Sequence, residues 1–132
     1  MLLVLDANVG LRVALEADGF ALLAEHVLTA PVLLRSEIGS VLHEALWRGE
    51  ISQELAETAR DRVLDADVEL VADLHVEAWE VAQQLGWAKT YDAEYVALAR
   101  RLSVPLLTAD ARLARGARRL VEVLTPAELL GR

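Results

Sequence analysis

The sequence has 132 residues, of which 55% are hydrophobic, and a mean hydropathy of +0.31; these values predict one compact domain, residues 1–132, with a well-filled core. It contains no cysteine, which excludes disulfide bonds and thiolate metal sites. The formal net charge of −8 argues against an ordinary nucleic-acid-binding protein, which needs a basic surface, but argues less against a nuclease whose acids bind metal ions.

The N-terminal residues MLLVLDANV predict neither a signal peptide nor a membrane anchor. No basic segment precedes the apolar run, and Asp6 interrupts that run early. No apolar stretch of the sequence approaches the roughly 20 residues that a membrane-spanning helix needs. We therefore expect a cytoplasmic protein, in agreement with the absence of cysteine.

The first half of the chain alternates short apolar runs with helical patterns. An unbroken apolar run that ends at a polar residue is typical of a strand buried on both faces of a parallel sheet. Predicted in chain order are a strand at 2–5, a helix at 8–17, a helical turn at 20–25, a strand at 27–29, a helix from Pro31 to Gly49 and a helix capped by Ser52. The apolar positions expected to face inward on the two longer helices are Leu34, Ile38, Val41, Leu42, Ala45 and Leu46, then Leu55, Ala59, Val63 and Leu64.

The second half continues the alternation. Predicted here are a strand at 68–71, a helix at 75–85 ending at Gly86, a loop at 87–90, a helix at 91–102, a strand at 104–108, a helix at 110–117, a strand at 120–124 and a final short helix after the capping sequence Thr125-Pro126-Ala127-Glu128. This order predicts an α/β domain with a central, mostly parallel sheet covered on both sides. In such sheets ligands bind outside the carboxyl ends of the strands.

Two aspartates follow predicted strands. Asp6 comes directly after the first strand, and Asp110 comes just after the strand at 104–108. If both strands are central and parallel, the two carboxylates lie at the same edge of the sheet. Alternatively, each aspartate caps the N-terminus of the helix that follows it.

Glu37 lies on the helix face that is expected to point inward. It follows Leu34 by three residues and precedes Val41 by four. A glutamate on that face needs a partner or a metal ion, because an unpaired buried charge is costly. A salt bridge to Arg12 or Arg35 is the alternative interpretation.

Asp92 is placed in the first turn of the helix at 91–102, with Thr90 as the expected N-cap. It shares one helix face with Tyr95 and Val96, so it should point toward the sheet. Glu94 lies about 200° around the helix from Asp92 and is expected to face solvent.

Four carboxylates at one sheet edge would repel one another unless a cation neutralised them. An all-oxygen ligand set favours Mg²⁺ or Mn²⁺ over Zn²⁺. Histidine ligands are not expected: His43 lacks the second histidine of a zinc-protease helix, and neither His26 nor His75 has helpful spacing. Metal ions held by carboxylates can activate a water for attack on a phosphodiester.

Four polar residues near the acids are candidates for supporting roles. Asn8 and Thr108 could orient the carboxylates, or could simply be a helix cap and a strand-end residue. Arg12 or Lys89 could contact a substrate phosphate, or could be ordinary surface charges.

Four segments that contain these acids resemble the successive motifs of PIN-domain proteins, and most of all those of the VapC-type toxins of bacterial toxin–antitoxin pairs. The segments are LDANV at 5–9, APVLLRSE at 30–37, YDAEYVALA at 91–99 and PLLTADARL at 105–113. Each motif is weak alone, but the four occur in the family's order and span the chain from the first strand to the last helices. The resemblance therefore identifies the chain as similar to this family.

The resemblance implies a three-layer α/β/α fold and an acidic quartet, Asp6, Glu37, Asp92 and Asp110, that binds Mg²⁺ or Mn²⁺. It implies that Asn8 and Thr108 accompany the first and last acids. The implied activity is endoribonuclease cleavage of RNA, often of a structured RNA such as a transfer RNA. The implied partners are a second copy of the chain, in a homodimer, and a cognate antitoxin that wraps the helices beside the active site.

Other families with an aspartate after an apolar strand fit less well. A haloacid-dehalogenase phosphatase needs a second aspartate where this chain has Asn8. A receiver domain usually has its phosphorylated aspartate in mid-chain and a lysine after a late strand, and neither is evident. A non-catalytic PIN-like module that binds metal or protein stays open. Gly10 and Gly39 lie inside predicted helices, where glycine is unfavourable, and we expect them to mark close packing to a neighbouring helix or to a partner.

Overall fold

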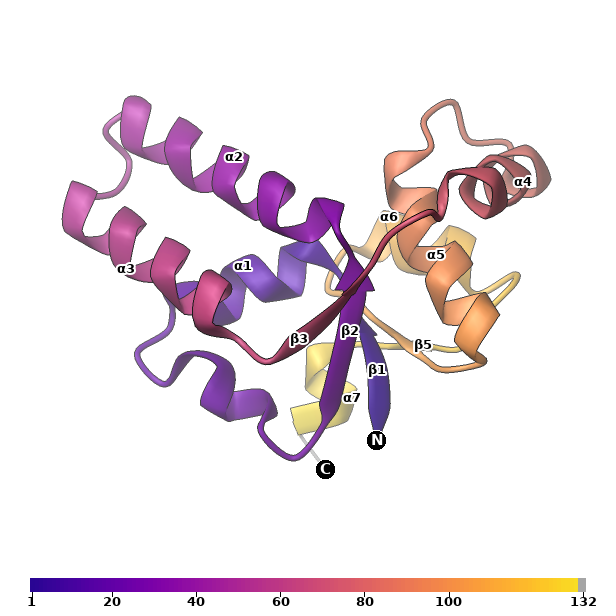
Figure 1. Ribbon diagram of the computed structural model, residues 1–132, viewed down its shortest axis with the longest axis horizontal. Helices are drawn as coiled ribbons and strands as arrows, with labels where there is room; N and C mark the ends of the chain where they lie inside the picture. Colours follow the sequence, from indigo (N-terminus) through magenta and orange to yellow (C-terminus); the bar gives the residue numbers. More distant parts are fainter. Residues whose placement is uncertain (131–132) are drawn as a thin grey trace.

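A computed structural model describes residues 1–130 and contains a five-stranded parallel sheet flanked by helices on both sides (Figure 1). The strands lie in the order β3-β2-β1-β4-β5. Their bounds are β1 (Leu2–Leu5), β2 (Val27–Pro31), β3 (Val68–Val71), β4 (Leu106–Leu107) and β5 (Val123–Leu124). Every neighbouring pair is parallel, which confirms the predicted α/β class.

Two groups of helices lie on opposite sides of this sheet. In Figure 1, α1, α2 and α3 are at the left of the sheet, and α4, α5 and α6 are at the right. The helix bounds are α1 (Ala7–Leu15), α2 (Leu33–Trp47), α3 (Gln53–Asp65), α4 (His75–Leu85), α5 (Tyr91–Leu102), α6 (Ala111–Ala117) and α7 (Pro126–Leu130), with a 3₁₀ helix, η1 (Gly19–Leu23), between α1 and β2. No helix within residues 1–130 is long and apolar enough to cross a membrane.

The central strand β1 sets the position of the carboxyl edge of the sheet. Its residues Leu3, Val4 and Leu5 are completely buried, as a strand covered on both faces requires. β1 pairs with β2 on one side and with β4 on the other. The Asp6 N–H donates to the Leu107 carbonyl at 3.1 Å, so the residues that follow β1 and β4 lie side by side.

Local signals in the sequence place most helix ends correctly. The predicted bounds of α4 and α5 are confirmed, and Gly86 ends α4 in the left-handed conformation, with φ +71°. Ser52 caps α3 by accepting a hydrogen bond from the Leu55 N–H at 3.1 Å. Thr125 likewise accepts from the Glu128 N–H at the start of α7.

The prediction that Pro31 opens α2 is wrong. Pro31 is the last residue of β2, where it pairs with Val71, and α2 begins at Leu33. The Val32 N–H donates to the Val71 carbonyl at 3.0 Å and continues the contact between β2 and β3. Strand pairing therefore extends past the point where the local sequence favours a helix start.

Two buried helix faces are narrower than predicted, and two strands are shorter. Val41 and Leu64 are about half exposed, whereas Leu34 and Ile38 on the same stripe as Val41 are buried. The strand expected at 104–108 is reduced to β4 and that expected at 120–124 to β5. β5 pairs only with the two-residue β4, so it has no partner over which to extend.

One of the two helical glycines marks close packing. A Cβ atom on Gly10 would lie 2.9 Å from Ile38 Cδ1, so its absence lets α1 approach α2. This approach brings the start of α1, next to Asp6, toward the first turns of α2, which carry Glu37. Gly39 does not pack closely on a neighbouring helix, since an added Cβ would meet nothing within 4 Å among the described residues; packing of Gly39 on a partner stays a prediction.

Candidate metal centre

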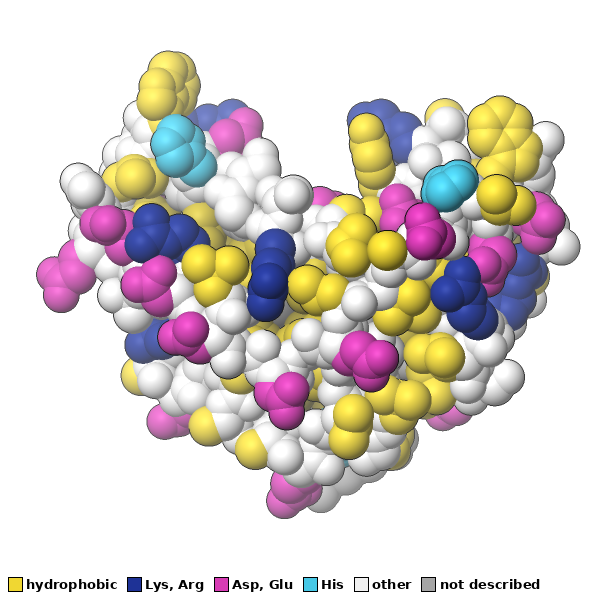
Figure 2. All heavy atoms as spheres, in the orientation of Figure 1, with side chains coloured by type: hydrophobic (Ala, Val, Ile, Leu, Met, Phe, Trp, Pro, Cys, Tyr) yellow, Lys and Arg dark blue, Asp and Glu magenta, His cyan; other side chains and the backbone are white. Residues whose placement is uncertain are grey.

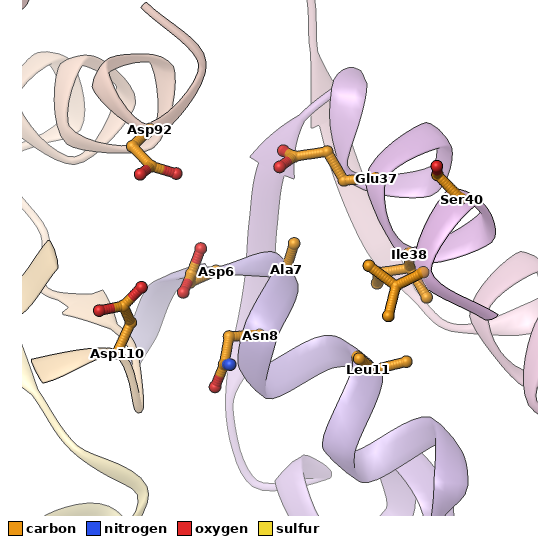
Figure 3. Close-up of a pocket in the computed structure, with 10 residues that line it drawn as sticks. Asp6, Ala7, Asn8, Leu11, Glu37, Ile38, Ser40, Asp92 and Asp110 are labelled. Carbon is orange, nitrogen blue, oxygen red and sulfur yellow. The ribbon is translucent and has the colours of Figure 1, made fainter. Parts of the chain in front are cut away.

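Four acidic side chains from four segments line one pocket at the carboxyl edge of the sheet (Figure 3). They are Asp6 after β1, Glu37 on α2, Asp92 on α5 and Asp110 before α6. The pocket has a volume of about 480 Å³. In the space-filling view the outline of the molecule is notched between the helices at the left and those at the right (Figure 2). The fold therefore brings together acids that are up to 104 positions apart in the sequence.

Asp6 is the most buried of the four acids, with 4% of its surface exposed. Its Oδ2 accepts a hydrogen bond from Thr108 Oγ1 at 2.7 Å. It occupies the N-cap position of α1 but makes no side-chain cap hydrogen bond, so the alternative interpretation as a helix cap does not hold for it. Burial raises the pKa of Asp6 to about 6; the Thr108 hydrogen bond opposes this rise, and the charges of Asp92 and Glu37 add to it.

Thr108 connects the first and last acids. Its side chain is completely buried and donates to Asp6. The same hydroxyl oxygen accepts from the Asp110 N–H at 3.1 Å. A single threonine thus holds the Asp6 carboxylate and the backbone at Asp110 in fixed positions.

Asp110 caps α6, as the alternative interpretation for this residue proposes. Its Oδ1 accepts from the N–H groups of Arg112 at 2.9 Å and Leu113 at 3.1 Å. Both cap hydrogen bonds go to Oδ1, and Oδ2 accepts none from residues 1–130. The capping role therefore fixes the side chain and leaves one oxygen for another ligand.

Glu37 is half-buried and is held by a tyrosine, not by an arginine. Tyr95 Oη donates to Glu37 Oε1 at 2.7 Å. The proposed salt bridge is absent from the described residues: Arg35 donates to the Leu64 carbonyl, and Arg12 is exposed. Burial raises the pKa of Glu37, the Tyr95 hydrogen bond opposes the rise, and Asp92 and Glu94 add to it. The pKa of Tyr95 is raised mainly by burial and, to a smaller extent, by the hydrogen bond to Glu37.

Asp92 lies in the first turn of α5, and its side chain points from α5 into the pocket (Figure 3). Desolvation raises its pKa, the charge of Asp110 adds to this, and Arg112 opposes it. The Thr90 side chain makes no cap hydrogen bond. The expectation that Glu94 faces solvent is wrong: it is half-buried, and its charge helps raise the pKa of Glu37. The reason is that α5 packs against both α4 and the sheet.

The other polar candidates occupy different places. Asn8 lines the acidic pocket but, among residues 1–130, makes no side-chain hydrogen bond to the carboxylates. Lys89 lines an adjoining pocket together with Asp92 and Asp110. Arg12 is exposed on α1 and lines neither pocket.

Sequence reasoning missed two side chains beside the acids. The apolar pattern places Tyr95 on the inward face of its helix, but does not identify it as the partner of Glu37. A buried tyrosine needs a hydrogen-bond partner for its hydroxyl, and that rule was the available signal. The second is Arg112, which lies two residues after Asp110. Its positive charge opposes the rise in the pKa of Asp92. No pattern in the sequence distinguishes Arg112 from the other arginines of α6.

The charge of this pocket suits a hard cation. None of the salt bridges within residues 1–130 involves Asp6, Glu37, Asp92 or Asp110, and carboxylates in proximity raise one another's pKa. The side chains that line the pocket offer carboxylate, amide and hydroxyl oxygens as ligands, which suits a hard divalent cation. Within the described chain no three acids are spaced to hold one ion by themselves. Mg²⁺ in such sites commonly takes only one or two carboxylates and fills its shell with water and substrate oxygens.

Comparison with known proteins identifies the family to which this chain belongs. The family model of the PIN domain matches residues 3–119. The chain belongs to the PIN domain family, as the four motifs indicated.

Its relatives include two named ribonucleases of Mycobacterium tuberculosis. Ribonuclease VapC1 is 41% identical over 96 residues, which cover 70% of each chain. Ribonuclease VapC9 is 37% identical over 116 residues, which cover 85% of this chain and 88% of the relative.

Two solved structures share the fold at low sequence identity. PAE2754 from Pyrobaculum aerophilum superposes with a TM-score of 0.79 at 21% identity and covers 100% of this chain and 97% of its own. VapBC2 from Rickettsia felis, bound to a DNA fragment from its promoter, superposes with a TM-score of 0.61 at 13% identity and covers 95% and 98%. Both confirm the expected PIN-like α/β/α architecture.

Proposed function

We propose that this protein is an endoribonuclease that depends on Mg²⁺ or Mn²⁺ and acts as the toxin of a toxin–antitoxin pair. The observation that carries the proposal is the pocket lined by Asp6, Glu37, Asp92 and Asp110, none of which forms a salt bridge within residues 1–130. The relatives named as VapC ribonucleases support both the RNA substrate and the toxin role.

Asp6, Glu37, Asp92 and Asp110 are the residues that would hold the metal. When bound, a divalent ion supplies a Lewis acid that lowers the pKa of a coordinated water and stabilises charge on the phosphate. Divalent-metal dependence is general for PIN-domain ribonucleases, and the choice of Mg²⁺ or Mn²⁺ rests on the all-oxygen ligand set.

The chain's own contacts pre-position these acids. Thr108 orients Asp6, Tyr95 orients Glu37, and the cap hydrogen bonds of α6 orient Asp110. For Glu37 and Asp110 the hydrogen bonds use one carboxylate oxygen, and the other accepts none from residues 1–130. Removing hydrogen bonds that orient metal ligands typically lowers metal affinity by about 10- to 100-fold.

The remaining polar residues take supporting roles in this proposal. Asn8, in the first turn of α1, lines the pocket, where it can hydrogen-bond a water or a phosphate oxygen. Lys89, on the wall shared with Asp92 and Asp110, contacts a substrate phosphate. Arg12 lines neither pocket, so it is the weaker of the two phosphate candidates.

The proposed partners are an antitoxin and a second copy of the chain. The Rickettsia felis VapBC2 structure, which shares this fold, supports the antitoxin. A net charge of −8 favours a basic partner segment near the acidic pocket. We propose the homodimer and the cytoplasmic location because the chain resembles VapC-type toxins.

RNA cleavage by the purified protein tests the proposal. Total bacterial RNA is incubated with partner-free protein in Mg²⁺ or Mn²⁺, with an EDTA control and an Asp6→Asn control. We expect discrete fragments that disappear in both controls, because the chemistry needs the metal and Asp6 helps to hold it. Mapping the fragment ends then gives the target.

Two outcomes contradict the proposal. Cleavage that survives Asp6→Asn refutes the assigned site. Absence of both RNA cleavage and Mn²⁺ binding by partner-free protein refutes the nuclease, and favours a non-catalytic PIN-like module that binds other proteins.

A further inference from the structure

Five cationic side chains on one side of the molecule have no acidic partner. They are Lys89, Arg112, Arg115, Arg118 and Arg119, which we call the basic strip, and all five are exposed. Within residues 1–130 none of the five side chains forms a salt bridge or a hydrogen bond. Lys89 is the single lysine of the sequence.

Most other cations of the described chain are engaged, which makes the strip distinctive. Arg48, Arg60 and Arg101 form salt bridges with acids. The guanidinium groups of Arg35, Arg62 and Arg100 donate to carbonyl oxygens or to a glutamine. Among the other arginines of residues 1–130, only Arg12 likewise forms neither a salt bridge nor a side-chain hydrogen bond. It lies on the opposite side of the sheet.

The inner end of the strip borders the acidic pocket. Lys89 and Arg112 line a second pocket of about 580 Å³, which shares Asp92 and Asp110 with the first. A volume of this size is within the roughly 300–1,000 Å³ of small-ligand sites. An extended ligand bound along this wall can therefore contact the cationic side chains and the acids of the candidate metal centre at the same time.

Close packing holds the two inner cations on one rigid wall. The loop that carries Lys89 begins with Trp87, whose indole packs on α6 at Gly116. A Cβ on Gly116 would lie 2.5 Å from Trp87 Cζ2, so only glycine permits this contact. The loop and α6 are thereby tied together beside Asp110.

The outer end of the strip follows the exposed face of α6. Leu113, Ala114 and Ala117 are buried against the core. Arg112 and Arg115, three residues apart, lie on the exposed face of α6, and Arg118 and Arg119 follow in the exposed turn after Ala117. With a rise of about 1.5 Å per residue, the seven residues of α6 extend about 10 Å from Asp110, which lines the acidic pocket.

A polyanion suits this surface better than a basic protein segment does. Five unpaired cations in a chain of net charge −8 concentrate positive potential where the remainder of the surface is acidic. A basic antitoxin segment would be attracted by the acids and repelled by the strip. Nucleic-acid affinity arises largely from phosphate contacts by Lys and Arg.

We propose that the basic strip is the phosphate-binding track for the RNA substrate, which leads from the acidic pocket past Lys89 and Arg112 and along α6 to Arg119. This inference rests on the proposed ribonuclease function. The track explains how a strongly acidic protein can bind RNA: the few cations that are not engaged elsewhere are gathered beside the site.

Binding of bulk bacterial transfer RNA tests the track separately from cleavage. Fluorescence anisotropy is measured in EDTA over a range of salt concentrations, with Asp6→Asn in every protein so that the RNA stays intact. The test variant adds Arg115→Ala, Arg118→Ala and Arg119→Ala, which lie away from the metal-binding acids. The control variant adds Arg48→Ala, Arg60→Ala and Arg100→Ala, which change the net charge by the same amount.

We expect the test variant to bind RNA on the order of tenfold more weakly and its log Kd–log salt slope to fall by about two, since each lost phosphate contact removes about 0.7 for single strands. The control variant should keep the slope of the parent. Replacing the same three arginines by lysine should restore the slope, because the contacts depend on charge. Thermal melting checks that all variants fold.

The outcomes separate the track from the proposed nuclease. Equal affinity and slope for test and control variants, or no RNA binding by the parent, would overturn the track. If the wild-type protein nevertheless cleaves RNA with metal, the nuclease proposal stands alone. If arginine-dependent binding occurs without any cleavage, the track stands and the nuclease proposal fails. In active protein the outer arginine variant should raise KM while kcat is unchanged.

Discussion

The two ends of the parallel sheet carry pockets of nearly equal size but different chemistry. The pocket at the carboxyl end has about 480 Å³, and that at the amino end has about 510 Å³. The amino-end pocket is lined by Phe20, Leu23, Ala24, His26, Val27, Leu28, Asp67 and Glu69. Its two acids come from one short stretch around β3 and are exposed. At the carboxyl end, four acids come from four separate segments, and Asp6 is almost completely buried.

This difference shows that volume does not identify the site. Acids that stay exposed on one segment remain solvated, and they need no counter-ion to be stable. Acids that four elements direct into one pocket lose part of their solvation, and desolvation is the main cause of the raised pKa of Asp6, Glu37 and Asp92. A fold keeps such a costly arrangement where a cation is to be bound.

The largest expected effect on RNA cleavage comes from replacing an acid of the carboxyl-end pocket, in comparison with the same replacement in the amino-end pocket. Asp110→Asn should reduce RNA cleavage about a thousandfold, since metal stabilisation of the reaction is worth several kcal/mol. Asparagine caps helices as well as aspartate does, so α6 should be retained. Asp67→Asn at the amino end should leave cleavage unchanged. Initial rates of cleavage of the same RNA measure both effects, and equal losses of activity in the two variants would contradict a metal centre at the carboxyl end of the sheet.

The second prediction concerns the pH dependence of stability in EDTA. The folded-state pKa of Asp6 is raised from 3.8 to about 6, so its ionisation opposes folding. The contribution of Asp6 to the free energy of unfolding is fully present below about pH 4 and is lost as the pH rises through about 6. Relative to Asp6→Asn, the free energy of unfolding of the wild type should fall by about 2 kcal/mol between pH 4 and pH 7. Urea denaturation of both proteins at each pH measures the difference, and parallel pH profiles would contradict it.

A third, smaller effect is expected at Thr108. Thr108→Val keeps the shape of the side chain but removes the donor to Asp6 and the acceptor for the Asp110 N–H. Loss of this contact should weaken Mn²⁺ binding by about 10- to 100-fold. Isothermal titration calorimetry measures the affinity, with Thr29→Val as the matched control, because Thr29 is buried in β2 and hydrogen-bonds the Glu69 carbonyl away from the acids. Equal affinities for the two variants would show that Thr108 serves the fold alone.

The smallest effect is expected at Tyr95. Tyr95→Phe removes the hydrogen bond to Glu37, which is half-exposed and keeps its access to solvent. Mn²⁺ affinity should fall by less than about tenfold, which corresponds to less than about 1.4 kcal/mol. Tyr91→Phe is the control, because Tyr91 is exposed on the same helix. A loss as large as that of Asp110→Asn would mean that Tyr95 takes part in the reaction itself.

Much of the fold could be predicted because its signals are local. The bounds of α4 and α5 follow from apolar periodicity together with Gly86, and β1 follows from an unbroken apolar run that ends at a polar residue. The site acids could be proposed because parallel strands end at one edge, which places Asp6 and Asp110 together. The structure brings both of them, with Glu37 and Asp92, to one pocket.

The sequence by itself determined the order of the elements, the parallel sheet and the chain positions of the four acids, because hydrophobic period, caps and strand ends act over a few residues. Tertiary structure alone decided that Pro31 belongs to β2, that Tyr95 holds Glu37, that Thr108 holds Asp6 and that the arginines of α6 lack partners within residues 1–130. These features depend on strand register and on the packing of helices that are distant in the chain. No local pattern encodes such contacts, because each requires two segments that meet only in the folded protein.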